Sequence, residues 1–514
     1  MRRSLLTAML ALAAVLGAAV WLGSPHAPAI EPAPEDIGVI WAIEDAREES
    51  GAPLVTALAL DGMPLEYYAQ ANTFYCTLGL GQGESWPQLR LTAPDAAGVR
   101  LRFTDDYTYD GCADAIREGY AYEIIAYTDE AYSYANVVFT GLPVLQLYAE
   151  ETIGEQEVQA EAVFSAYAER ALRSPARVHL RGDSSLAWTP KGGYKVEFTR
   201  GAGRGKTPQR VAGLCETDEL VLLPLSTDAT MMRDRLSWEL VNRAFDADEG
   251  FGGLPSQYVE VYVNDGYQGV YLMLKPYDAV GEMSKEGTQA INLDSLYRMS
   301  RPDAEGGRPA IADPTEPEAT FELFYAPDME RGFDGLQSYL ALMGEEDDEA
   351  FARKALACLD MDSLLRYMLI VQAGCMVDNV TNNMYIWAHS EDGAIRYRFA
   401  FWDMDLTWGI FAGEEGDRWV KFPLADRVLA LDVGGARRRT QEIWETLKAR
   451  GLTAETVEKL IAEYANVLEE SGAFARDARR WGKTAIHPDG YEEIVGFASA
   501  RFQMMDDWVR ALVP

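Results

Sequence analysis

The chain has 514 residues, more than a single hydrophobic core usually supports, so we expect two folded units. Hydrophobic residues make up 48% of the sequence, with 12 Trp and 26 Tyr, which supplies enough apolar surface for sizeable cores and excludes a largely disordered chain. The formal net charge of −35 excludes nucleic acid and anionic lipid as general partners, and basic protein segments or cations suit such a surface better.

Residues 1–29 have the features of an export signal. Two arginines at positions 2 and 3 precede an uncharged apolar run over residues 5–23, and an Ala-Pro-Ala triplet ends the segment in the small-x-small form that signal peptidases accept. The run is also just long enough to span a bilayer, so an uncleaved membrane anchor is the alternative. We therefore expect an exported protein.

A β-rich module follows over residues 37–142, after a Pro- and Ala-rich linker at residues 30–36. Short runs of β-forming residues separated by Gly, Asp and Pro are the pattern of a small all-β sandwich. The predicted strands cover residues 38–42, 74–80, 88–91, 99–103, 121–126 and 135–140. Because this module contains no catalytic constellation, we interpret it as a spacer or as a contact module for carbohydrate or protein.

The five cysteines form no CxxC pair and have no histidine cluster beside them, which argues against a zinc site. Cys76 and Cys112 lie in the same module and could form a disulfide in an exported chain. The odd count leaves at least one cysteine unpaired in a monomer.

Residues 143–514 mix strands and helices, which predicts an α+β domain. Strands are predicted at residues 144–148, 176–180 and 194–198, followed by a helix over residues 230–245 and a hairpin with its turn at Asn264-Asp265-Gly266. Beyond these we predict helices over 333–343, 347–358 and 361–373, a second hairpin from 384–388 and 395–402, and helices over most of 438–513.

The segment around Asp378 gives the strongest indication of chemistry. Asn383 follows five residues later, and the predicted hairpin then leads to Asp403, with Asp405 close by. Phosphoryl transfer uses one carboxylate to orient the attacking hydroxyl, and an amide oxygen and a second carboxylate to hold Mg²⁺ against the phosphates. Either segment alone, the one from Asp378 to Asn383 or the one from Asp403 to Asp405, could be a polar loop whose Asn and Asp cap turns. Together, joined by one hairpin, they predict a kinase-type site.

Upstream, a small polar loop contains Arg181, Ser184 and Ser185, and its backbone N–H groups could bind an anion. Lys191 and Lys195 follow at and within the next predicted strand, from which a lysine can reach a phosphate as a point charge. Each feature is weak alone, because a Gly-Ser turn before an exposed lysine is common.

The order of the elements strengthens this interpretation. A strand lysine, a helix that contains Glu239, and the hairpin over residues 258–274 follow one another as in the small lobe of a protein kinase. Glu239 could pair with the strand lysine or face solvent. The four histidines are scattered, so a Ser/His/Asp hydrolase has little support, and metal-assisted hydrolysis is a minor alternative.

Taken together, these segments resemble the CotH (spore coat protein H) kinase family over residues 143–514. The similarity is carried by Arg181-Gly182-x-Ser184-Ser185, Pro190-Lys191, Tyr194-Lys195-x-x-Phe198, Asp228, Met232-Arg233-Asp234-Arg235-Leu236, the hairpin from Tyr258 to Tyr271, Asp378 to Asn383, and Trp402-Asp403-x-Asp405-x-Thr407-x-Gly409. The chain departs from the family at Lys275, where an acidic residue is usual.

The resemblance implies an atypical protein-kinase-like, two-lobed domain that uses ATP with Mg²⁺ or Mn²⁺ to phosphorylate Ser or Thr in secreted, cell-surface or spore-coat proteins. It makes Asp378 the catalytic residue, and Asn383 and Asp403 the metal ligands, with Asp405 beside them. Either Lys191 or Lys195 would contact phosphate.

Two alternatives to kinase activity stay open: a catalytically dead pseudokinase that serves as a cell-surface scaffold, and transfer of AMP from ATP onto protein. A basic, Ser-rich protein segment would suit the acidic surface as a substrate, and the sequence does not indicate an oligomeric state.

Overall fold

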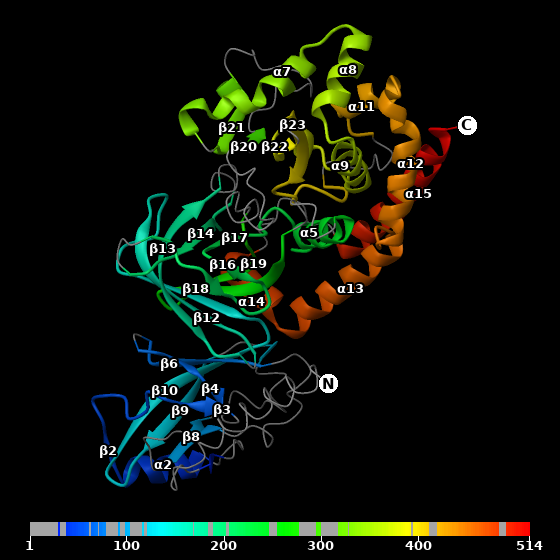
Figure 1. Ribbon diagram of the computed structural model, residues 1–514. Coiled ribbons are helices and arrows are strands. Elements are labelled where there is room, and N and C mark those ends of the chain that lie inside the picture. The colour runs from blue at the N-terminus through cyan, green and yellow to red at the C-terminus, as the bar shows by residue number, and fades with distance from the viewer. Residues whose placement is uncertain are drawn as a thin grey trace, which may run out of the picture.

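The computed structural model describes residues 29–30, 37–60, 63–69, 71–78, 91–92, 98–102, 116–117, 121–167, 169–182, 189–201, 205–245, 254–276, 295–299, 317–326, 328–391, 394–410, 419–482 and 490–513. A β-rich module, a β-barrel and a mostly helical part follow one another along the molecule (Figure 1). Within these ranges no helix combines the length and apolar character needed to cross a membrane. The apolar run at residues 5–23 lies outside them, as do Ser184, Ser185 and Cys112.

The N-terminal module contains two sheets. The larger has the order β5-β6-β10-β9-β8 with β2 paired to β10, and the smaller has the order β1-β7-β3-β4. Their bounds are β1 (Ala29–Ile30), β2 (Glu48–Glu49), β3 (Ala59–Leu60), β4 (Met63–Pro64), β5 (Glu66–Tyr68), β6 (Thr73–Thr77), β7 (Leu91–Thr92), β8 (Gly98–Arg102), β9 (Ala121–Tyr127) and β10 (Ala131–Thr140). Four of the predicted strands are therefore found in the larger sheet.

Helix α2 (Ile37–Asp45) corrects the strand predicted at residues 38–42, and with it the all-β description of this module. Ile40 and Ile43 are buried and pack against Ile125 of β9, whereas Val39 and Trp41 are exposed. Buried positions three residues apart follow the helical period. The β-branched residues favoured a strand locally, but packing on the sheet determines the outcome.

Seven strands close into a barrel of order β11-β12-β13-β14-β17-β19-β18, in which only β11 and β18 pair in parallel. Their bounds are β11 (Val144–Ala149), β12 (Val158–Ser165), β13 (Leu172–Arg181), β14 (Gly193–Phe198), β17 (Glu219–Leu223), β18 (Ser256–Val263) and β19 (Gly266–Leu274). Alternate residues fill the interior: Tyr194, Val196 and Phe198 of β14 belong to its core. The predicted hairpin is confirmed as β18–β19.

The C-terminal part surrounds a sheet of order β21-β20-β22-β23, which consists of β20 (Ser295–Met299), β21 (Phe321–Tyr325), β22 (Met384–Glu391) and β23 (Ala394–Phe401). The helices are α7 (Gln337–Met343), α8 (Asp348–Cys358), α9 (Met361–Gly374), α10 (Asp378–Thr381), α11 (Pro423–Ala430), α12 (Ala436–Ala449), α13 (Ala454–Glu470), α14 (Ala473–Trp481) and α15 (Tyr491–Ala511). The predicted α+β class is confirmed.

Helix α5 (Arg233–Ala244) joins the barrel to this helical part (Figure 1). The carboxylate of Asp228 accepts hydrogen bonds from the backbone N–H groups of Thr230, Met232 and Arg233 at 2.9–3.0 Å, and so satisfies donors at the start of the helix. The guanidinium of Arg233 also donates to Asp228 at 2.5 Å, and both side chains are buried. The beginning of α5 is therefore firmly fixed.

Helix α14 returns from the helical part to the barrel and carries two buried ion pairs. Arg476 binds both carboxylate oxygens of Glu260 at 2.8 Å and donates to the backbone oxygen of Ile116 in the N-terminal module at 2.6 Å. The next residue, Asp477, accepts from Lys191 Nζ at 2.5 Å and from the backbone N–H of Val270 at 2.7 Å. One turn of α14 thus links three parts of the chain.

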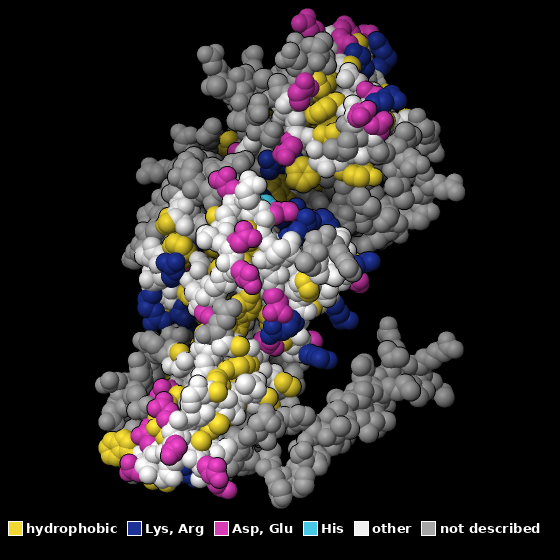
Figure 2. Space-filling view, turned by 90° about the vertical axis from the view of Figure 1, so that its left-hand side faces the viewer, with side chains coloured by type: hydrophobic (Ala, Val, Ile, Leu, Met, Phe, Trp, Pro, Cys, Tyr) yellow, Lys and Arg dark blue, Asp and Glu magenta, His cyan; other side chains and the backbone are white. Residues whose placement is uncertain are grey.

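Aromatic side chains add to the contact between the N-terminal module and the barrel. Tyr68 stacks on Tyr148 with ring centroids 3.8 Å apart, and Tyr75 meets Tyr262 edge to face at 4.9 Å. The module is therefore packed against the barrel rather than tethered to it. Acidic side chains occur along the whole length of the face shown in Figure 2, while Lys and Arg form smaller groups between them.

Candidate active site

The β22–β23 hairpin brings the predicted site segments together. Its register pairs Met384 with Phe401, so Asn383 and Trp402, the residues just outside this pair, lie side by side at the open end. The buried amide of Asn379 donates to the backbone oxygen of Trp402 at 2.7 Å and to that of Asn383 at 3.3 Å. Asn379 therefore fixes the loop before β22 to the end of β23.

Asp378 and Asn383 are in direct contact. Asn383 Nδ2 donates to Asp378 Oδ2 at 2.6 Å, and the backbone N–H of Asn383 donates to the Asp378 backbone oxygen at 3.1 Å. The first bond uses an N–H of the Asn383 amide, so its carbonyl oxygen is the atom that could bind a cation. The sequence predicted this pair, and the structure brings it together.

Asp403 and Asp405 lie on the loop after β23, close to Asp378. Burial, followed by the negative charge of Asp403, raises the pKa of Asp378 to about 6 and that of Asp405 to about 8. Thr227, from the loop before α5, donates its hydroxyl hydrogen bond to Asp405. Carboxylates that raise one another's pKa values create a site whose charge a divalent cation would offset, so these residues fit Mg²⁺ or Mn²⁺.

Asp234 of α5 also faces this cluster, although the sequence reasoning gave it no role in the site. Its side chain is buried, and burial followed by the charges of Asp403 and Asp405 raises its pKa well above the usual range. The spacing in the sequence could have indicated this position, because Asp234 is seven residues before Val241 and therefore lies on the same buried face of the helix. Asp234 is thus the α5 acid nearest the predicted site.

Two arginines lie beside the acidic residues. The guanidinium of Arg181, at the end of β13, lies 5.4 Å from the ring centroid of Trp402, which directly precedes Asp403. Arg298 of β20 forms an ion pair with Glu322 at 3.1 Å, and its charge opposes the burial and the Asp403 charge that raise the pKa of Asp378. Arg181 places the start of the predicted polar loop next to the acidic cluster.

The two predicted phosphate-contacting lysines are engaged elsewhere. Lys191 is 1% exposed, donates to the backbone oxygen of Val270 at 2.6 Å and pairs with Asp477, and burial lowers its pKa against the opposing effect of Asp477. Lys195 lies on the outside of the barrel, with its Nζ 3.3 Å from a carboxylate oxygen of Glu219.

Glu239 of α5 does not pair with either lysine. Its carboxylate accepts from Arg243, one turn further along the same helix, at 2.9 Å, and both side chains are more than one-third exposed. Of the two possibilities left open for Glu239, pairing with the strand lysine or facing solvent, the structure therefore shows the second. Lys275, where the chain departs from the family pattern, is buried at the end of the barrel.

In the described ranges, no group of three or more His, Cys, Asp or Glu side chains is arranged to hold a metal ion. The predicted ligand set differs from such a group, since it combines the amide of Asn383 with two carboxylates, Asp403 and Asp405.

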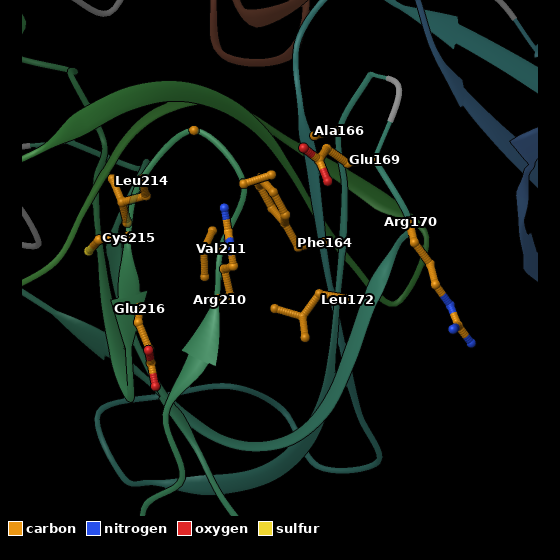
Figure 3. A pocket seen from close by; sticks show the side chains of 12 residues that line it. Phe164, Ala166, Glu169, Arg170, Leu172, Arg210, Val211, Leu214, Cys215 and Glu216 are labelled. Atoms are coloured by element: carbon orange, nitrogen blue, oxygen red, sulfur yellow. The ribbon is translucent and has the colours of Figure 1, made fainter. Parts of the chain in front are cut away.

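A pocket of about 440 Å³ lies elsewhere, on the barrel (Figure 3). It is lined by the connection between β12 and β13 and by the hairpin of β15 (Gln209–Arg210) and β16 (Glu216–Thr217). None of the predicted site residues lines it, so it is separate from the acidic cluster.

The metal-free protein is expected to lose stability as the pH rises from about 4 to about 8. Because the folded-state pKa values of Asp378 and Asp405 are about 6 and about 8, the folded protein keeps protons that the unfolded chain has released in this window. The free energy of unfolding therefore decreases with rising pH. Melting temperatures in EDTA would test this. The pKa of the buried Asp234 is raised as well, so Asp378, Asp405 and Asp234 all contribute to the slope. Asp405→Asn lacks one of these titrating groups, so an unchanged slope in that variant would contradict the assignment.

The chain was compared with models of protein families. A model described as CotH kinase protein matches residues 178–505, which is more than half of the chain and runs from β13 into α15. The matched part contains Asp378, Asn383, Asp403 and Asp405. No curated protein matches the chain at a significant level.

Proposed function

The chain belongs to the CotH kinase family, and on that basis we propose that it is a metal-dependent protein kinase, transferring the γ-phosphate of ATP to a Ser or Thr hydroxyl of a protein. One observation carries the proposal: a single hairpin brings the Asp378–Asn383 pair beside the loop of Asp403, where the barrel meets the helical part. An orienting carboxylate, an amide and a second carboxylate are the groups that this reaction uses.

In this proposal Asp378 orients the substrate hydroxyl and accepts its proton. With a pKa of about 6, the carboxyl is mostly ionised at neutral pH and can act as a hydrogen-bond acceptor. The hydrogen bond from Asn383 fixes its orientation. Asn383, Asp403 and Asp405 would hold Mg²⁺ or Mn²⁺, whose charge offsets that of the phosphates.

Of the predicted phosphate-binding cations, Arg181 supports the proposal best, because it lies beside Trp402 at the edge of the acidic cluster. Lys191 would have to leave its buried pair with Asp477 to reach a nucleotide, and Lys195 its pair with Glu219. We therefore assign phosphate contact to Arg181, together with the polar loop that follows it.

A basic, Ser-rich segment of an exported, cell-surface or spore-coat protein is the substrate we propose. The net charge of −35 favours attraction of a cationic peptide, and the signal-like N-terminus supports export of the enzyme. The two proteins would then meet outside the cell or in a spore compartment.

Incubation of the purified protein with ATP and Mg²⁺ or Mn²⁺, followed by intact-mass spectrometry, tests the proposed reaction. We expect added mass in steps of one phosphate, on the protein itself or on an added basic Ser-rich peptide. Mass gains of one AMP would instead indicate nucleotidyl transfer. No mass gain, together with no thermal stabilisation by ATP and metal, would favour a scaffold.

A further inference from the structure

The loop that carries Asp403 and Asp405 continues to Thr407, Trp408 and Gly409. Its backbone conformation is unfavourable at both ends, because Asp403 and Trp408 have φ values of 49° and 51°, in the left-handed region that side-chain-bearing residues rarely adopt. Such a loop keeps its shape only where surrounding contacts hold it. In the proposed function the two acids bind the metal, whereas Thr407 has no role.

The hydroxyl of Thr407 lies at the centre of a buried hydrogen-bond network. It donates to the backbone oxygen of Met404, the residue between the two acids, at 2.8 Å. On its other side, Thr407 Oγ1 lies 3.1 Å from the hydroxyl oxygen of Ser237 in α5. The indole N–H of Trp408 also donates to this Ser237 oxygen, at 2.9 Å. All four residues are at most 1% exposed, so the network is closed to solvent.

Two further hydrogen bonds hold the same loop. The backbone N–H of Trp408 donates to the backbone oxygen of Gly374, the last residue of α9, at 2.8 Å. Thr227, from the loop before α5, donates to the carboxylate of Asp405. Because Gly374 is four residues before Asp378, the loop also contacts the segment that leads to the proposed base. The metal-ligand loop is therefore bound at fixed points on both sides of the site.

We propose that Thr407 is a positioning residue. Its hydroxyl, held by Ser237 of α5, fixes the backbone oxygen of Met404 and so keeps Asp403 and Asp405 where they would bind the metal. The catalytic part of this inference rests on the proposed kinase function. Valine has nearly the shape of threonine but makes neither hydrogen bond, so a Thr-to-Val exchange separates the hydroxyl from the bulk of the side chain.

Variants of the full chain test the inference, with one measurement that does not depend on activity. Thr407→Val removes the hydroxyl, Thr407→Ser keeps it, and Ser237→Ala removes its partner. Thr440→Val is the matched control, because Thr440 is also fully buried and donates to the backbone oxygen of Ala436 within α12 at 2.7 Å. Hydrogen exchange is followed in peptides covering residues 399–410. Phosphate transfer to a basic Ser-rich peptide is measured as kcat and KM for ATP.

For Thr407→Val we expect hydrogen exchange in the loop peptides to accelerate about tenfold and kcat to fall about 10- to 100-fold, with a smaller change in KM. Thr407→Ser should keep both quantities within about threefold of wild type, because it retains the hydroxyl. Ser237→Ala should resemble Thr407→Val. The kcat loss of the double variant should be smaller than the product of the two single losses, since the hydroxyls belong to one network. Thr440→Val should change neither measurement.

Unchanged hydrogen exchange in Thr407→Val would overturn the inference. A Thr407→Ser variant as impaired as Thr407→Val would also overturn it, because the methyl group and not the hydroxyl would then matter. So would an equal loss of kcat in Thr440→Val, or single losses that multiply in the double variant. If the wild-type protein transfers no phosphate at all, the kinase proposal fails, while the exchange measurement still decides the positioning role.

Discussion

Replacing Asp378 with Asn is expected to lower the rate of phosphate transfer by about 10²- to 10⁴-fold, the usual contribution of a positioned general base. Asn cannot accept the proton of the substrate hydroxyl, and it replaces a carboxylate that is mostly ionised at neutral pH, since the pKa of Asp378 is about 6. Single-turnover measurements of phosphate transfer from radiolabelled ATP, at saturating metal, would give the ratio of the wild-type rate to the Asp378→Asn rate directly.

Binding of ATP and metal should distinguish the role of Asp378 from that of Asp403. Asp378→Asn should still be stabilised against heat by ATP and metal, whereas Asp403→Asn should lose most of that stabilisation, because Asp403 is proposed as a cation ligand. Asp334 is an exposed acid that pairs with Arg331 on the surface, so Asp334→Asn is the control and should change neither the rate of phosphate transfer nor the stabilisation by ATP and metal. Full transfer activity in Asp378→Asn would contradict the proposed mechanism.

Replacing Arg476 with Ala is expected to destabilise the protein by about 3–5 kcal/mol, the usual cost of removing one partner of a buried ion pair. Arg476 binds both oxygens of Glu260, whose side chain is fully buried, so the variant leaves an uncompensated charge inside the protein. It also removes the hydrogen bond to Ile116. Urea unfolding followed by circular dichroism would measure the loss.

A double variant tests why Arg476→Ala should lose stability. If the penalty comes from the unpaired charge, Glu260→Leu combined with Arg476→Met should recover a large part of the stability that Arg476→Ala loses. Arg438→Ala removes an exposed arginine whose pair with Glu442 is on the surface of α12, so it should change little. If Arg438→Ala and Arg476→Ala lowered the free energy of unfolding equally, burial of the Arg476–Glu260 pair would be unimportant for stability.

The sequence was sufficient to predict the contact between Asn383 and the Asp403 loop because both belong to one local hairpin. Once Met384 and Phe401 begin and end paired strands, the residues just outside the pair must meet. Helices α8, α9 and α12 to α15 were predicted for a similar reason, since their periodic apolar residues are close together along the chain.

The remaining contacts depend on packing between distant segments, which the sequence does not fix. Lys191 finds its partner 286 residues later in Asp477, and no local pattern distinguishes that pair from a lysine exposed for phosphate binding. On α5 the choice between Asp234 and Glu239 required knowing which helix face turns inward. In helix α2, burial of Ile40 and Ile43 against the sheet outweighed a local preference for β structure.

The two ion pairs of α14 determine when this chain can finish folding during its synthesis. Glu260 and Lys191 lie in the barrel, yet their partners are made 216 and 286 residues later. Until the ribosome has passed Asp477, a closed barrel would contain an unpaired carboxylate and an unpaired ammonium, each costly to bury. Stable closure therefore waits for nearly the entire chain, and a nascent polypeptide that stays open is in the form that a narrow export channel can thread.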